Sequence, residues 1–503
     1  MPDLLPVCMQ DVVHAWEPGL QEVTRIPDNE RRRPSATGIR RNWHWFQAAD
    51  ARFLLDVQSG SLHSVDEAAW NVLEALASLD GESAGSGKRS ATVAAVAGLD
   101  LKQTEDVLDD LDTLIAEGTL AWPDDEDPVP SELGPGVVKA MCLHVAHDCD
   151  MRCGYCFAGT GGFGGTRSLM PPEIACAALD LLFDISGHVK HLDVDFFGGE
   201  PLLAMDTVVR AVEHGRKLEA ETGKVLKFTI TTNARGLSPE IGKFLNENRI
   251  AAVLSLDGRP EVHDAVRKTA SGEPTFERSS QNALRFVKTR PDGPDGEYYA
   301  RGTYTRKNTD FVNDVLFLAD MGFSSISFEP VVAPPSAPYS IRESDLEEIY
   351  ESYDRLVREM DLRRREGRGF RFFHFDLDVA KGPCLAKRLL GCGAGREYVA
   401  VTPDGDLYPC HQFVGREGFS MGDVYRGIEK PEIGEAFASA HIYAKEACRD
   451  CWARYLCSGG CHANAHQMNG TLMEPYSMGC MITRKRLESA LAFAGIGSGC
   501  DDQ

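Results

Sequence analysis

The hydrophobic and polar residues first form regular patterns in a segment that predicts a small module of strands followed by helices. The segment HWFQAADARFLLDVQSGSLHSV predicts β-strands that fold back on one another, with Ser59 and Gly60 as turn residues. Asp66 is expected to cap a helix in which the apolar residues of AAWNVLEALASL recur at helical spacing. Two more helices follow, TVAAVAGL and QTEDVLDDLDTLIAEGTL, and the second ends at Gly118 before a short edge strand, LAW. This order of elements predicts a winged-helix module over residues 44–121.

Strand and helix patterns then alternate between residues 137 and 338. Repeated βα units imply an α/β fold with a parallel sheet. In such folds the functional residues gather at the carboxyl ends of the strands. The predicted strands, in chain order, are VKAMCLHVA, HLDVDFFGG, KFTITTN, AAVLSLDG, YYARGTYT and SISFEPVV.

Changes in composition separate the remaining segments. Arg and Pro are frequent in residues 1–43, which are expected to be loosely ordered, and an acidic, Pro-rich linker is predicted over 122–136. A charged amphipathic helix, ESDLEEIYESYDRLVREMDLRRREG, dominates a bridging segment, 339–383. It leads into a cysteine-rich region, 384–490, and then a tail, 491–503.

Length and charge narrow the possible functions. A chain of 503 residues is long enough for roughly three domains. The formal net charge of −23 argues against a nucleic-acid partner, which requires a basic surface. No run of about 18 apolar residues predicts a membrane-spanning helix, and the N-terminal MPDLLPVCMQ lacks the basic-then-apolar pattern of a secretory signal. The protein is therefore expected in the cytoplasm, without a nucleic-acid or membrane partner.

The fifteen cysteines are the most informative part of the composition. Eleven of them fall in two short groups, which does not suit a disulfide scaffold. In a reducing compartment, clustered cysteines bind metal or take part in catalysis more often than they form disulfides. The four isolated cysteines are expected to be small buried hydrophobic residues; they are Cys8, Cys142, Cys176 and Cys500.

The first group lies in HDCDMRCGYCF, directly after a predicted strand, and has C-x3-C-x2-C spacing. Three thiolates on one tight loop can hold three irons of a [4Fe–4S] cube and leave the fourth iron open. Zinc would require a fourth protein ligand, which His144 or His147 could supply. The predicted ligands are Cys149, Cys153 and Cys156.

The cysteine array and the later segment GGEPLL together resemble the signature of the radical SAM superfamily. The resemblance implies a partial (β/α)6 TIM-like barrel, in which the open iron binds the amino and carboxylate groups of S-adenosylmethionine (SAM). It also implies that polar residues at successive strand ends bind SAM, with Glu200 placed to pair with a cation and Arg267 with a carboxylate. The SAM-binding positions implied in this way are Tyr155, Gly198, Gly199, Glu200, Thr231, Thr232, Asn233, Ser255, Asp257 and Arg267.

The second cysteine group contains a C-x2-C-x5-C-x3-C array with three thiols upstream and one downstream. Eight thiols suffice for two four-iron clusters with only cysteine ligands; two zinc ribbons are the alternative. The pattern resembles the SPASM extension of radical SAM peptide-modifying enzymes, which carries two auxiliary clusters. The resemblance assigns one cluster to Cys384, Cys392, Cys410 and Cys461, and the other to Cys448, Cys451, Cys457 and Cys480.

The sequence departs from the SPASM pattern at two positions. Seven residues separate Cys384 from Cys392, and the first thiol of this set is the most variable part of the pattern. If Cys384 is not a ligand, its cluster has an open iron. Anaerobic sulfatase maturases with this extension carry an aspartate proton acceptor where this chain has His411, which argues against sulfatase maturation.

The N-terminal module suggests the class of substrate. The segment FLLDVQSGSLHSVDEAAWNVL resembles the leader-recognition element of ribosomal peptide biosynthesis, in which a strand edge accepts the leader peptide as an added strand. The alternative, a winged-helix DNA reader, would need a basic recognition helix that the sequence lacks. Over residues 44–490 the chain resembles SCIFF-type peptide maturases, with CLHVAHDCDMRCGYCFAGTGGFGGTRSLM and VAVTPDGDLYPCHQFVG as the most similar segments.

This resemblance implies an enzyme that installs thioether cross-links, from a cysteine sulfur to a carbon atom, in a cysteine-rich precursor peptide. The implied cofactors are three [4Fe–4S] clusters and SAM, and the implied partners are a precursor with its leader and a reducing protein such as flavodoxin or ferredoxin. The alternatives are another SPASM peptide modification, such as a carbon–carbon cross-link or an epimerisation, and a non-catalytic cluster protein. GGEP beside the cysteine loop disfavours the last, because a storage protein needs no SAM pocket.

Overall fold

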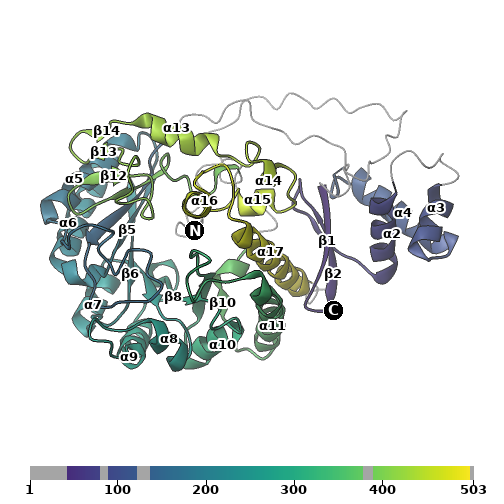
Figure 1. The fold of residues 1–503 in the computed structure, drawn as a ribbon, viewed down its shortest axis with the longest axis horizontal. Coiled ribbons are helices and arrows are strands. Elements are labelled where there is room, and N and C mark those ends of the chain that lie inside the picture. Colours follow the sequence, from purple (N-terminus) through teal and green to yellow (C-terminus); the bar gives the residue numbers. More distant parts are fainter. Residues whose placement is uncertain (1–41, 80–88, 122–135, 378–388, 499–503) are drawn as a thin grey trace.

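The computed structural model describes residues 42–79, 89–121, 136–377 and 389–498. The predictions for residues 1–41, for 122–135 of the linker, for Cys384 and for the end of the tail therefore lie outside the described residues. The predicted α/β fold is present, and its central element is a large twisted sheet with helices around it (Figure 1).

Six parallel strands form the centre of this sheet and follow one another in chain order. Each predicted strand is present, because a run of apolar residues is buried between two layers of the fold. In the centre, Leu143, Phe196 and Ile230 have no exposed surface. The strands are β4 (Ala140–Ala146), β5 (His191–Gly198), β6 (Val225–Thr232), β7 (Ala251–Ser255), β8 (Tyr298–Tyr304) and β9 (Ser325–Pro330).

Helices connect these strands and cover the outer face of the sheet (Figure 1). Local signals set their ends: the Ser238 side chain caps α7 by accepting from Ile241 N, and Gly322 closes α10 with a φ of 107°. The helices are α5 (Pro172–Ile185), α6 (Met205–Thr222), α7 (Pro239–Glu247), α8 (Pro260–Val266), α9 (Phe276–Val287), α10 (Val312–Met321) and α11 (Leu346–Arg365), with short 3-10 turns at η1 (Pro201–Ala204), η2 (Pro294–Gly296) and η3 (Glu343–Asp345).

The cysteine-rich region continues the same sheet, which periodicity alone did not predict. β11 (Tyr398–Val401) pairs in parallel with β4, and β12 (Asp406–Tyr408), β13 (Gly422–Asp423) and β14 (Gly427–Ile428) extend it as an antiparallel meander. At the opposite edge, β10 (Arg371–Phe372) pairs with β9 and leads into η4 (Phe373–Phe375). The two cysteine-bearing regions therefore share one sheet.

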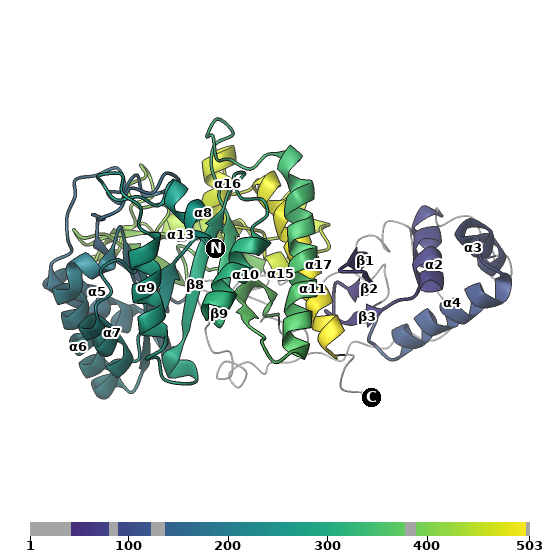
Figure 2. The same ribbon diagram turned by 90° about the horizontal axis from the view of Figure 1, so that it is seen from below.

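In the described part of the C-terminal region the helices include α13 (Pro431–Ser439), α14 (Glu446–Arg449), α15 (Arg454–Cys457), α16 (His462–Asn469) and α17 (Ser477–Ser498). α17 lies beside α11 (Figure 2), and the Lys485 ammonium joins the two helices by binding the Asp354 carboxylate at 2.7 Å. No helix in the described ranges is long and apolar enough to cross a membrane.

Within its described residues, 42–79 and 89–121, the N-terminal module has a three-stranded antiparallel sheet and three helices. The strands are β1 (Trp43–Ala48), β2 (Ala51–Asp56) and β3 (Leu62–Ser64), and the helices are α2 (Glu67–Ser78), α3 (Arg89–Ala97) and α4 (Leu101–Ala116). The predicted Asp66 cap is present, because its side chain accepts from Ala69 N at 2.8 Å. The predicted turn at Gly60 is also present, with a φ of 79°. The winged-helix assignment stays a prediction.

The edge strand predicted at LAW is wrong for its described residues. Ala121 has no strand partner; its N–H donates to the Asp56 carboxylate at 3.1 Å, and its carbonyl accepts from the Trp43 indole at 2.9 Å. The side chains of β1 and β2 therefore take the hydrogen bonds that a neighbouring strand would have supplied.

Candidate functional site

The predicted cysteine loop directly follows β4, at the carboxyl end of the parallel strands. Backbone hydrogen bonds tie it to the end of α8 and the chain that follows: Arg152 N donates to Lys268 O at 2.7 Å, and Gly154 N to Val266 O at 2.8 Å. Inside the loop, Met151 N donates to Cys149 Sγ at 3.4 Å. These hydrogen bonds hold the loop in place, and its thiols face one cavity.

The ionisation of these thiols tests whether they suit a metal cluster. Burial raises the pKa of Cys149 to about 12 and that of Cys153 to about 11. All cysteines in the described part of the chain are free. Deprotonated thiolates here need a compensating positive charge, which bound iron supplies. The donor set therefore fits an iron–sulfur cluster.

The zinc alternative required a histidine ligand beside these cysteines. His144 and His147 instead lie against each other, with His144 Nδ1 3.1 Å from His147 Nε2, and burial lowers the pKa of His147 to about 4. Within the described ranges no three His, Cys, Asp or Glu side chains converge on a single-ion position. The geometry gives no support to a zinc site.

The two glycines of the GGE segment allow β5 to approach the cysteine loop. Gly198 has a φ of 128°, and a Cβ there would lie 2.2 Å from Ala146 O. A Cβ on Gly199 would lie 2.2 Å from Asp148 O. Gly199 N donates to Ala146 O at 2.7 Å, so the close approach is a hydrogen-bonded contact. Only glycine fits at either position.

Glu200 is buried under the ends of the neighbouring strands, with 2% of its surface exposed. Its carboxylate accepts from Thr232 Oγ1 at 2.7 Å, Asn233 N at 2.8 Å and Leu202 N at 3.1 Å. Burial raises the pKa of this carboxyl to about 7, although the three hydrogen bonds lower it. Glu200 therefore fixes the positions of Thr232 and Asn233.

Asn233 in turn holds the cysteine loop. Its side-chain amide donates to the Asp150 carboxylate at 2.8 Å, and Arg235 binds the other oxygen of Asp150 at 2.6 Å. The strand ends predicted to bind SAM thus also determine where the cysteines lie.

Arg267 already has a carboxylate partner in the protein. Its guanidinium Nε lies 3.0 Å from Asp257 Oδ2, which also accepts from the Tyr155 hydroxyl at 2.5 Å. The guanidinium lies over the Tyr155 ring, 5.6 Å from its centroid. Arg267 therefore neutralises buried Asp257, and the predicted pairing with a SAM carboxylate would compete with this contact.

A cavity of about 630 Å³ collects most of the predicted residues. This volume lies in the range of small-molecule sites. Glu200 and Asp257 lie beneath its wall rather than on it. The predicted residues that line it are Cys149, Cys153, Tyr155, Cys156, Gly198, Gly199, Thr231, Thr232, Asn233, Ser255 and Arg267 from the side of the parallel strands, and Cys457, Cys461 and Cys480 from the cysteine-rich side.

Charge interactions connect several of the C-terminal cysteines, whose division into two ligand sets stays a prediction. Burial raises the pKa of Cys410, and Cys461 and Cys392 raise it further. The pKa of Cys448 is raised to about 12 in total. Burial has the largest effect, Lys445 lowers the pKa, and the other three cysteines of the predicted set, Cys451, Cys457 and Cys480, raise it. Each set therefore contains thiols close enough to repel as thiolates, as a cluster site requires.

Two family models match the chain. A model described as a 4Fe-4S single cluster domain matches residues 133–280, and an iron-sulfur cluster-binding domain, SPASM, matches residues 392–452. A cysteine-type anaerobic sulfatase-maturating enzyme of Clostridium novyi is 25% identical over 63% of this chain and 86% of its own length. The radical SAM cyclopropyl synthase TigE of Paramaledivibacter caminithermalis is 21% identical over 67% of this chain and 70% of its own length.

These matches support a relationship of the chain to the radical SAM/SPASM family.

Two solved structures have a similar fold. One is native anSMEcpe with bound AdoMet, with a TM-score of 0.60, 21% identity, and coverage of 71% of this chain and 99% of that chain. Another is Streptococcus suis SuiB bound to the precursor peptide SuiA, with a TM-score of 0.50, 16% identity, and coverage of 89% and 100%.

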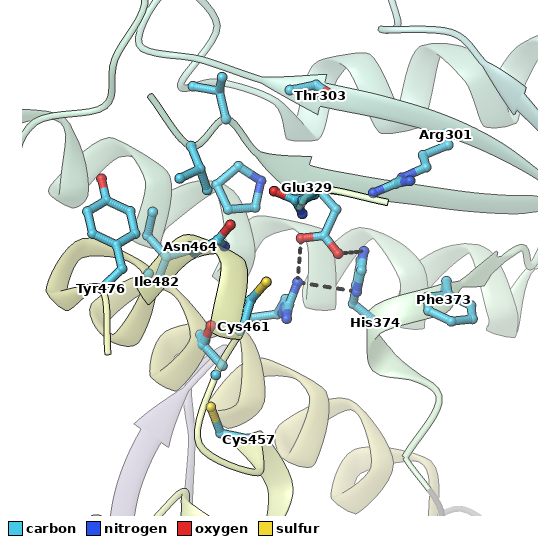
Figure 3. A pocket seen from close by; sticks show the side chains of 18 of the residues that line it. Arg301, Thr303, Glu329, Phe373, His374, Cys457, Cys461, Asn464, Tyr476 and Ile482 are labelled. Carbon is cyan, nitrogen blue, oxygen red and sulfur yellow. Dashed lines mark hydrogen bonds and ion pairs between the residues drawn. The ribbon is translucent and has the colours of Figure 1, made fainter. Parts of the chain in front are cut away.

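The cavity also contains a charged network that the sequence did not single out (Figure 3). Glu329 accepts from Arg486 at 3.1 Å, and its other oxygen lies 3.4 Å from His374 Nε2. Burial raises the pKa of Glu329, but His374 and Arg486 outweigh this effect and lower it to about 2. Glu329 could have been found, because it stands near the carboxyl end of β9. His374 and Arg486 reach it from η4 and α17, which no local pattern indicates.

Proposed function

We propose that this protein is a radical SAM maturase that installs thioether cross-links in a ribosomally made, cysteine-rich precursor peptide. The observation that carries the proposal is the shared cavity, whose wall contains the first cysteine loop, the polar ends of the parallel strands and three cysteines of the SPASM region. A reaction that begins at the first cysteine loop can therefore reach a group held by Cys457, Cys461 or Cys480.

The proposed cofactors divide the chemistry among the cysteine sets. A four-iron cluster on Cys149, Cys153 and Cys156, with SAM on its open iron, would supply a 5′-deoxyadenosyl radical. The chain's own residues orient the reactants: Glu200 holds the ends of β6, and the buried Asp257 fixes the Tyr155 hydroxyl.

Forming a thioether from a thiol and a C–H bond removes two hydrogens from the peptide. One leaves as a hydrogen atom transferred to the radical. The other leaves as a proton from the thiol, together with one electron that needs an acceptor. We propose that the SPASM cysteines hold iron–sulfur acceptors, with Cys384 as a further ligand, and that flavodoxin or ferredoxin in a reducing cytoplasm supplies the initiating electron.

Two observations support a peptide substrate. The N-terminal module resembles a leader-recognition element, and SuiB, which has a similar fold, was solved bound to its precursor peptide SuiA. The alternative is another SPASM modification of a peptide, such as an epimerisation or a carbon–carbon cross-link, and the name of TigE, a cyclopropyl synthase, favours the latter.

Mass spectrometry distinguishes these reactions. Reconstituted, reduced protein with SAM and a cysteine-rich precursor should give a product that lacks two hydrogens per cross-link and resists thiol alkylation at the linked cysteine.

Variants test the roles of the cysteines. Replacing all three of Cys149, Cys153 and Cys156 with Ala should abolish both product formation and SAM cleavage. Cys410→Ala should retain SAM cleavage but lose the cross-link. A dehydrogenated product in which every cysteine is still alkylated would favour the carbon–carbon alternative and overturn the thioether assignment.

A further inference from the structure

The N-terminal module forms part of the wall of the reaction cavity. The end of β2 and the following turn, Leu55–Gly60, line the same cavity as Cys457, Cys461 and Cys480. Figure 2 shows the module's sheet between its own helices, α2 and α4, and the helix α17 of the C-terminal region. The module is thus in contact with the body of the protein at the place where the cysteines lie.

Polar and aromatic contacts fix the module to the SPASM region. His44 in β1 stacks on Trp452, with ring centroids 3.8 Å apart and an interplanar angle of 5°, and its Nε2 lies 3.0 Å from Glu488. Asn42 accepts from Arg454 at 2.9 Å. The Arg454 side chain is buried, with 1% of its surface exposed. A buried arginine bonded across this boundary is typical of a permanent interface.

The second face of the module's sheet is covered by apolar packing. Phe46, Phe53 and Leu55 form one cluster with Leu491 and Ala492 of α17. Their burial is nearly complete, at 2–4% exposed. In an isolated module these side chains would be exposed, at a cost of roughly 1.5–3 kcal/mol each. The sheet is therefore expected to keep its position on the protein.

The turn itself packs on Cys448, one of the C-terminal cysteines. Val57 belongs to an apolar cluster with Cys448 and Tyr455. The buried Asp56 carboxylate accepts from Gln58 N at 3.3 Å and from Ser59 N at 3.2 Å, which fixes the turn from within. The residues that follow Val57 therefore face the cavity in a defined conformation.

We propose that the turn Val57–Gly60 contacts the peptide substrate in the reaction cavity, beside the residue that is modified. The inference rests on the proposed function and deepens it, because it gives the recognition module a second contact with the substrate. The turn offers the Gln58 amide, the Ser59 hydroxyl and the backbone of Gly60, groups that hydrogen-bond to the main chain of an extended peptide. The Glu329 network forms a charged patch of the same cavity.

Photo-crosslinking of the full-length, reconstituted protein tests this contact. Ser59, which is exposed, is replaced with p-benzoylphenylalanine, and the complex with the cysteine-rich precursor is irradiated. We expect cross-links from position 59 to the core segment of the precursor. The same probe at Tyr425, which is 69% exposed and outside the cavity, is the matched control and should give none above background.

A second probe position, Gln58, guards against a local defect at Ser59. Absence of core cross-links from both positions at saturating precursor overturns the proposal. Cross-linking does not depend on turnover, so the turn contact and the thioether reaction are tested separately. Thioether product without core cross-links rejects the turn contact, whereas core cross-links without thioether product reject the proposed reaction and keep the turn contact.

Discussion

Glu200 should give the protein a measurable pH dependence. Its pKa is raised from 4.5 to about 7, mainly by burial, so between these values the folded chain holds a proton that the unfolded chain has released. Stability from this group is therefore highest below about pH 4.5 and falls as the pH rises to 7. Glu200→Gln should remove this decline, at most about 3.5 kcal/mol, because one pKa unit corresponds to about 1.4 kcal/mol.

Urea unfolding of the metal-free protein at several pH values measures this effect. Glu221→Gln, on the exposed side of α6, is the matched control and should keep the wild-type pH profile. An unchanged decline in Glu200→Gln would show that another group titrates in this range.

Arg267 should be more important for stability than for recognition of a ligand. Asp257 is fully buried, and Arg267→Met would leave its carboxylate without an ion-pair partner. Breaking a buried ion pair in this way costs about 3–5 kcal/mol. Arg235→Met breaks the more exposed pair with Asp150 and should cost about 1 kcal/mol or less. The urea midpoint of each variant, compared with that of the wild type, measures its loss of stability. Equal losses in Arg267→Met and Arg235→Met would contradict the buried role of Arg267.

At the scale of elements, the junction of β5 with the cysteine loop is the most demanding part of the fold. A Cβ at Gly199 would lie 2.2 Å from Asp148 O and 3.1 Å from Cys149 Cβ, so Gly199→Ala must displace the loop. We expect this variant to lose the iron bound by the first cysteine group and to lose SAM cleavage, while the rest of the chain stays folded.

Gly236→Ala is the matched control, because its nearest neighbour would be Leu202 at 3.7 Å. It should retain wild-type iron content and SAM cleavage. Wild-type iron in Gly199→Ala would show that the cysteine loop can shift without losing its cluster, and would contradict this prediction.

Local patterns predicted the elements themselves but not their long-range partners. The predicted strand HLDVDFFGG corresponds to β5, and the helix expected to be capped by Asp66 corresponds to α2, because burial and capping act over a few residues. The pairing of β11 with β4 could not be predicted, because no local signal specifies which strand edge is free. The edge strand LAW was wrong because side chains of β1 and β2 bind its backbone.

The same division applies to the candidate site. Cysteine spacing indicated the first group, because Cys149, Cys153 and Cys156 are close together in the chain, whereas the two later sets come from the resemblance to the SPASM extension and stay a prediction. Arg267 was expected near a ligand carboxylate, but its partner Asp257 depends on how α8 packs. The Glu329 network was missed because Arg486 reaches it from α17. Contacts between distant segments are what the sequence leaves undetermined.

At the scale of the whole molecule, iron content tests the division into three cluster sites. Three four-iron cubes require about twelve irons per chain. The Ala variant of Cys149, Cys153 and Cys156 should retain about eight, since each cube is held by its own cysteines. Iron and sulfide analysis of reconstituted protein measures this, and a count near four in the triple variant would remove one auxiliary cluster from the proposal.

The fixed position of the N-terminal sheet would also set a minimum length for the precursor segment between the leader and the modified residue. If the leader docks on a sheet edge that cannot move, the chain between leader and modified residue has to bridge a constant gap, so spacers shorter than the gap should give no product. Longer spacers should loop out at little cost, because each doubling of loop length costs only about 0.6 kcal/mol. A series of precursors with shortened and lengthened spacers, followed by mass spectrometry, would show this asymmetry as a sharp lower limit and a gradual upper decline. A module that swung freely would instead tolerate both changes alike, and the modified position would drift along the peptide.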